Sequence, residues 1–145
     1  MSSLRDVVGV ELGPTDWLEV SQQRIDTFAQ ATDDHQWIHV DPVRAAEGPF
    51  GTTIAHGYLT LSLCAPLLSQ ALAGLTDSPM SINYGTNRVR FPAPVPAGSR
   101  IRARATVVSV DDVPGGEQAV VLTTVEREGG EKPVCVAEIV LRRLR

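Results

Sequence analysis

The sequence predicts an α+β protein in which an antiparallel β-sheet wraps around one long central helix. Residues 48–76 contain no Asp, Glu, Lys or Arg, and within them "HGYLTLSLCAPLLSQALAGL" (56–75) has apolar side chains on most faces. Such a helix should be buried nearly all round. Alternating hydrophobicity then marks four strands, near 82–91, 100–110, 119–127 and 134–141. Only turns separate these strands, so they should pair antiparallel. A plain sandwich would leave the apolar helix with nothing to enclose it.

Shorter elements are expected before the central helix. The segment 17–32 begins as a short extended piece. From Ser21, which can cap a helix, its apolar residues recur at helical spacing. Asp41 followed by Pro42 marks the start of a second helix over 42–47. The stretch between the two helices is expected to be a loop.

Proline and glycine mark the breaks in this pattern. Pro66 lies inside the central helix, where it should either kink the helix or divide it into two pieces. Clusters at 92–96, 111–116 and 129–130 mark the turns between strands.

Composition narrows the class of protein. A chain of 145 residues with 43% hydrophobic residues fits one globular domain over 1–145. The net charge of -4 argues against a nucleic-acid partner. Cys64 and Cys135 both lie among apolar neighbours and lack metal-site spacing, so buried free thiols in a reducing compartment are expected. With no signal peptide and no membrane-length apolar run, the expected location is cytoplasmic, with no membrane partner.

The stretch "ATDDHQWIHV" (31–40) carries the most chemistry, with two carboxylates and two imidazoles within seven residues. It could be an acidic loop, a metal site or an acid–base pair. His35 and His39 are four positions apart, as metal ligands can be. However, this H-x-x-x-H lacks the Glu of H-E-x-x-H and lies beyond a helix end, so no metal is expected.

Three motifs in order resemble one family. They are the D-x-x-x-x-H pair within "DDHQWIHVDPVRAAEGPFG", then "TIAHGYLTLSL", then "INYGTNRVRFPAPVP". Together they resemble the MaoC-like dehydratases, which are (R)-specific enoyl-CoA hydratases with a hot-dog fold, and within that family the nodulation protein N branch. The similarity runs from about residue 26 to residue 110.

The resemblance implies an activity and a site. It implies (R)-specific hydration of trans-2-enoyl-CoA, or the reverse dehydration, with Asp34 and His39 as the catalytic dyad and no metal or redox cofactor. The amide of Gly57, at the start of the central helix, would bind the thioester oxygen. The substrate would be an acyl-CoA or acyl-carrier thioester, and the protein would be a homodimer. An edge strand and apolar surface left by a small single-layer sheet also favour pairing.

The loop departs from the family pattern at three positions. The family has Gly, Asn and Pro where this chain has Asp33, Gln36 and Trp37. The dyad is intact, but the hydrogen bonding of the loop, and with it the substrate preference, should differ.

The residues suit this chemistry on elementary grounds. Hydration needs a base for water, an acid for Cα and donors for the developing oxyanion. With ordinary pKa values of about 3.9 and 6.5, Asp is ionised and His titrates near neutrality. A helix start offers free amides, and a glycine there lets a ligand approach the backbone closely.

Each candidate also has a structural alternative. His39 could only bond backbone, and Asp33 rivals Asp34 by composition, so only the spacing to His39 prefers Asp34. His56 could cap the central helix or line the site, and a structural role is favoured. Gln36, Asn83 and Tyr84 are the other candidate pocket residues, and for Asn83 and Tyr84 the alternative is an ordinary strand.

Alternating arginines form the last pattern. Arg88 and Arg90 could contact the phosphates of coenzyme A, since Arg suits phosphate geometry. The alternative is the solvent face of a half-buried sheet, which also fits Arg100, Arg102 and Arg104. Two other functions stay open: a non-catalytic acyl-thioester-binding protein and a hot-dog thioesterase.

Overall fold

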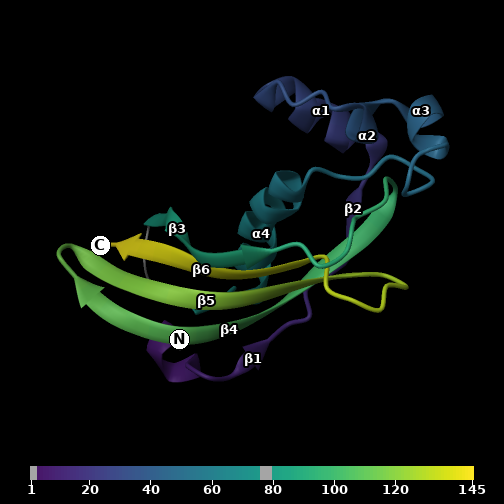
Figure 1. The fold of residues 1–145 in the computed structure, drawn as a ribbon. Helices are drawn as coiled ribbons and strands as arrows, with labels where there is room; N and C mark the ends of the chain where they lie inside the picture. Colours follow the sequence, from purple (N-terminus) through teal and green to yellow (C-terminus); the bar gives the residue numbers. More distant parts are fainter. Residues whose placement is uncertain (1–2, 76–79) are drawn as a thin grey trace.

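In the computed structural model, which describes residues 3–75 and 80–145, one curved antiparallel sheet wraps around a central helix (Figure 1). The sheet order is β1-β4-β5-β6-β3, and β2 also pairs with β4. The strands are β1 (Glu11–Leu12), β2 (Leu18–Val20), β3 (Met80–Arg90), β4 (Ser99–Val113), β5 (Gly116–Arg127) and β6 (Cys135–Leu144). The four expected strands and their antiparallel pairing are confirmed. Residues 76–79, which precede β3, lie outside the described residues.

Alternation along β4 explains which face of the sheet is buried. Ile101, Ala103 and Ala105 are fully buried, whereas the arginines between them face outward. On the outer face Arg100 pairs with Glu128 at 2.5 Å, and Arg102 and Arg104 pair with Glu126. The solvent-face reading of these three arginines is therefore confirmed. The β4–β5 turn is tighter than expected, because pairing continues to Val113↔Gly116.

The central helix α4 (Gly57–Ala71) packs against β4, β5 and β6. Its buried face is formed by Leu59, Thr60, Leu63, Cys64, Leu67 and Leu68. The expectation of burial nearly all round is wrong for this chain, because the sheet covers only one side of α4 and Tyr58 on the other side is 72% exposed. Pro66 also lies on the exposed side, and the helix continues through it as one piece.

The remaining helices are short. They are the 3-10 helix η1 (Leu4–Val7), α1 (Gln22–Thr32), α2 (Trp37–Val40) and α3 (Pro42–Ala46). The expected caps are confirmed: Ser21 accepts a hydrogen bond from the Arg24 amide, and Asp41 accepts one from the Arg44 amide. The loop expected between α1 and α3 instead contains α2, a single turn closed by the bond from the Asp41 amide to the Trp37 carbonyl.

The two ends of the sheet differ in what covers them. Helices α1, α2 and α3 cluster beyond one end, and the C-terminus lies at the other (Figure 1). At the β3 edge, nearly every residue of the strand is exposed on both faces. Both cysteines are buried free thiols, as expected. No helix in the described part of the chain combines the length and apolar character needed to cross a bilayer.

Candidate active site

Asp34 is placed by the end of helix α1. Asp33 closes α1 in the left-handed conformation with φ of 61°, and its side chain is 96% exposed. This turn reverses the chain, so that the next residue, Asp34, lies over the start of α4. The Asp34 carboxylate accepts a long hydrogen bond of 3.4 Å from the Gln36 amide. The structure therefore separates the two rival carboxylates, one facing solvent and one facing the histidines.

His39 is held on α2 with one ring nitrogen occupied. Its side chain is buried, with 7% exposure, and Nδ1 lies 2.7 Å from the carbonyl oxygen of Ile54. A carbonyl only accepts, so Nδ1 carries the proton and Nε2 is left as the basic nitrogen. Burial lowers the pKa of His39, and the His56 ring lowers it further, whereas the bond to Ile54 and the Asp34 charge act in the opposite direction. The lowered pKa favours a neutral imidazole near pH 7.

His56, the residue before α4, contacts both members of the dyad. Its Nε2 donates to the backbone carbonyl of Asp34 over 2.9 Å, and its ring stacks on His39 with centroids 3.9 Å apart. Phe28 closes the other side, 4.9 Å away. The side chain is 3% exposed, and its Nδ1 has no hydrogen-bond partner among the described residues. His56 therefore lines the site and does not cap the helix with its side chain.

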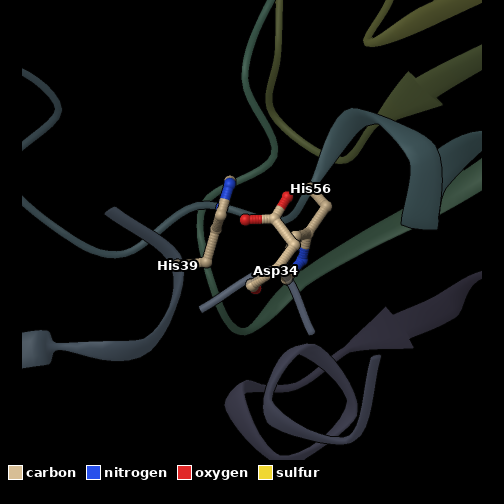
Figure 2. Close-up of side chains that lie close together, drawn as sticks. All are labelled: Asp34, His39 and His56. Atoms are coloured by element: carbon tan, nitrogen blue, oxygen red, sulfur yellow. The ribbon is translucent and has the colours of Figure 1, made fainter. Parts of the chain in front are cut away.

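Three side chains converge at this point (Figure 2). One oxygen of Asp34 and one nitrogen each of His39 and His56 all lie within 4.8 Å of one another. The spacing suits a cation, but the ring arrangement does not. A histidine lone pair lies in its ring plane, and planes stacked at 22° have no common point close to both nitrogens. The trio is better arranged for handling protons.

The start of α4 faces the same site. Gly57 follows His56 directly, and the first amides of a helix have no partners within it. A Cβ on Gly57 would lie 3.0 Å from the ring of Phe91, so any side chain at this position would have to displace that ring. The positive end of the helix dipole adds to the attraction for a developing negative charge.

A brace behind His39 was not foreseen from the sequence. Gln22 donates from Nε2 to the His39 carbonyl at 2.8 Å and to Asp26 at 2.8 Å. The buried hydroxyl of Thr53 donates in turn to Gln22. Gln22 is 17 positions from His39 and 31 positions from Thr53, so no local sequence pattern indicates these contacts.

A large cavity of about 490 Å³ lies between α4 and strands β3 and β6. It is lined from α4 mainly by Leu61, Ala65, Leu68 and Leu72, and from the sheet by β3 and β6. Asn83, a candidate pocket residue, lines this cavity. Asp34, His39 and His56 are not among the described residues that line the cavity.

The other candidates are dispersed. Gln36 is exposed at the start of α2. Tyr84 does not line the cavity, and the guanidinium carbon of Arg142 lies 3.8 Å from the centroid of the Tyr84 ring. Arg88 and Arg90 lie on the exposed strand β3, where Arg90 donates to the Val89 carbonyl.

A curved sheet around one helix, with a carboxylate and imidazoles at that helix's start, defines a hot-dog protein equipped for acid–base chemistry. The MaoC like domain matches residues 5–130. The chain is 52% identical to 3-hydroxyacyl-thioester dehydratase Z of Mycobacterium tuberculosis, over 98% of this chain and 94% of the relative. It is 47% identical to nodulation protein N of Rhizobium leguminosarum bv. viciae, over 93% and 87% respectively.

A solved structure agrees with these relatives. The (R)-hydratase from A. caviae involved in PHA biosynthesis superposes with a TM-score of 0.73 at 28% identity, covering 94% of this chain and 98% of that one. The chain belongs to the MaoC-like dehydratase family. It is an enzyme of the hydro-lyase class.

Proposed function

We propose that this enzyme adds water to trans-2-enoyl thioesters to give (3R)-3-hydroxyacyl thioesters, and catalyses the reverse dehydration. The observation that carries the proposal is the convergence of Asp34 and the free nitrogen of His39 beside the start of α4. The names of the dehydratase and (R)-hydratase relatives support the same reaction.

The dyad acts on a single water. Ionised Asp34 and neutral His39 each accept a hydrogen bond from one O–H group of the water. These two bonds hold the water oxygen toward Cβ of the enoyl thioester. As the oxygen bonds to Cβ, one proton passes to the dyad and the electron pair of the double bond moves to the thioester oxygen. The dyad then returns a proton to Cα from the same face. The addition is therefore syn, and the water is the source of both new hydrogens.

The start of α4 stabilises the intermediate charge. The Gly57 amide donates to the thioester oxygen, which becomes negative as Cβ is attacked. Its position next to His56 keeps the oxyanion donor and the dyad in one rigid unit. No metal or redox cofactor takes part, because the chain supplies a base, an acid and an oxyanion donor.

The thioester extends in two directions from this point. The acyl chain lies in the cavity along α4, whose lining is mostly apolar. Arg88 and Arg90, exposed on β3, contact the phosphates when the carrier is coenzyme A.

A homodimer completes the enzyme. Strand β3 is the edge strand next to β6, with nearly every residue exposed, and the uncovered side of α4 leaves Tyr58 in solvent. A second copy of the chain covers both features when two β3 edges pair around a twofold axis. A monomer in sedimentation at micromolar concentration would contradict this assembly.

One assay separates the proposed reaction from its alternatives. Crotonyl-CoA incubated with the enzyme should lose its enoyl thioester absorbance and yield the (3R) product, identified by chiral chromatography. Free thiol release would indicate a thioesterase, and binding without turnover would indicate an acyl-thioester carrier. Production of the (3S) isomer would contradict the assigned geometry.

A further inference from the structure

The cavity along α4 has one charged residue in its described lining. Arg143, near the end of β6, is that residue, and the other lining side chains are apolar or small and neutral. Arg143 is 5% exposed. Its Nη2 is buried and has no hydrogen-bond partner within residues 3–75 and 80–145. A buried guanidinium with an unmet donor is costly, and it is most simply satisfied by an acceptor that enters with a ligand.

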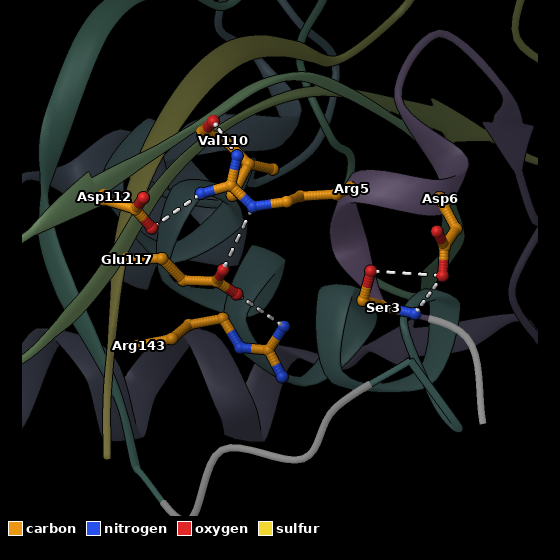
Figure 3. Close-up of polar contacts among 7 residues, drawn as sticks. All are labelled: Ser3, Arg5, Asp6, Val110, Asp112, Glu117 and Arg143. Atoms are coloured by element: carbon orange, nitrogen blue, oxygen red, sulfur yellow. Dashed lines mark hydrogen bonds and ion pairs between the residues drawn. The ribbon is translucent and has the colours of Figure 1, made fainter.

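The neighbours of Arg143 leave its charge only loosely balanced. Its Nη1 lies 3.6 Å from Glu117, beyond hydrogen-bond distance. Glu117 is shared with Arg5, whose Nε lies 4.0 Å away (Figure 3). Arg5 is itself anchored to Asp112 at 2.8 Å and to the Val110 carbonyl at 3.1 Å. The carboxylates of this cluster therefore hold Arg5 closely and Arg143 weakly.

Arg143 is also remote from Asp34 and His39. β6 ends beside the C-terminus, at the opposite end of the sheet from α1, α2 and α3 (Figure 1). The cavity begins one turn into α4 at Leu61 and continues to Leu72. A chain that starts at the Gly57 amide and follows α4 would therefore meet apolar side chains first. The neutral polar groups near Arg143 come from β3, where Ser81 pairs in register with it and Asn83 also lines the cavity.

We propose that the preferred substrates are enoyl thioesters whose acyl chain carries a carboxylate at its far end, bound by Arg143. The inference rests on the proposed function and names the substrate class of that site. A terminal carboxylate would accept from Nη2 and balance the buried charge, and Ser81 and Asn83 would offer further donors. An apolar acyl chain of the same length would leave Nη2 without a hydrogen-bond acceptor. The site would therefore favour acyl chains with a terminal negative charge over apolar ones.

The test compares two substrates that differ only at the terminus. kcat/KM is measured for trans-2-enoyl-CoAs of increasing length that end in a carboxylate, and for their terminal methyl esters. At the length that reaches Arg143, the carboxylate should be favoured about tenfold or more, the range for a hydrogen bond to a charged group. Equal values at every length would overturn the inference, and this comparison needs no variant.

Two variants locate the effect. Arg143→Met should bring the carboxylate-to-ester ratio to about one. Arg142→Met is the matched control, since Arg142 bonds Gln118 and lies over Tyr84 outside the cavity, and it should keep the wild-type ratio. A preference that survives in Arg143→Met would also overturn the inference. Free dicarboxylic acids are added to test for a general anion site. If the rate of ester hydration does not change and the preference for the carboxylate substrate remains, the ligand of Arg143 is the carboxylate of the substrate.

Failure of this inference is distinct from failure of the proposed function. If the enzyme hydrates the esters and the carboxylates equally, the reaction stands and the role of Arg143 falls. If neither series is hydrated, the proposed reaction itself is wrong.

Discussion

The rings of His39 and His56 lie stacked, with centroids 3.9 Å apart and planes inclined by 22°. The same His56 ring donates to the backbone carbonyl of Asp34. One buried side chain therefore fixes the position of both members of the dyad. Among the described residues, His56 makes no hydrogen bond to the Asp34 carboxylate or to Nε2 of His39, so we class it as a positioning residue.

Replacing His56 should disturb the dyad without removing it. His56→Phe keeps a ring against His39 but loses the donor to Asp34, so kcat should fall by about tenfold or more, since small misplacements of reacting groups are costly. The pKa of His39 should rise toward its ordinary value, because His56 lowers it. The pH profile of kcat/KM measures this shift. His35→Phe, at an exposed histidine, should leave both rate and profile unchanged.

Asp34 and His39 should act as one unit on one water. Asp34→Asn and His39→Ala should each lower kcat by about 10²–10⁴. The double variant should be little worse than the poorer single variant, as for other groups that act together. Asp33→Asn is the control and should matter far less, because its side chain faces solvent. Losses that simply multiply, or an indispensable Asp33, would refute the shared-water mechanism.

The lowered pKa of His39 predicts how pH affects rate and stability. In the proposed mechanism the neutral imidazole is the active form, so kcat/KM should rise with pH through an apparent pKa below about 6.5. An unfolded histidine binds protons at higher pH than the folded one. Stability should therefore fall as pH drops from about 6.5 to the folded pKa, and level off below it. Thermal unfolding of wild type and His39→Gln across this window checks the sign, since the variant should lose that contribution.

Gly57 should tolerate no side chain during turnover. Gly57→Val should fold, because Phe91 is 39% exposed and its ring can move outward, yet kcat should fall by about 10²–10³, as for loss of one oxyanion donor. Circular dichroism and steady-state kinetics separate folding from turnover. Gly57→Ala combined with Phe91→Leu should recover part of the rate. Normal turnover by the folded Gly57→Val enzyme would rule out this amide.

The Gln22 brace should affect both stability and rate. Gln22→Met leaves the buried Thr53 hydroxyl and the His39 carbonyl without their partner, which should cost about 1–3 kcal/mol in the free energy of unfolding. Urea denaturation measures that cost, and kcat should fall with it because His39 is less firmly held. Gln23→Met, at the exposed neighbouring position, should be close to wild type in both.

Local chemistry determined much of the fold from the sequence. The period-two strands and the Ser21 and Asp41 caps depend on near neighbours, and they lie where the pattern predicts. Two breaks differ, because the β4–β5 turn is tighter than expected and α4 continues through Pro66. The five-residue spacing of Asp34 and His39 likewise identified the stretch that reaches the start of α4. The prediction that α4 is buried nearly all round was wrong. Hydrophobicity indicates that a helix face avoids water, but it does not indicate what covers that face.

Only the tertiary structure decided which groups work together. Asp33 and Asp34 are neighbours of equal chemistry, and they differ because the left-handed turn at Asp33 sends one carboxylate to solvent. The contacts of His56 and Gln22 with the dyad, and the placement of Arg143 in the cavity, join residues far apart in the chain. A hydrogen bond depends on the distance and direction between two groups in space, and the separation of two residues along the chain determines neither. These partners therefore come together only when the sheet closes around α4.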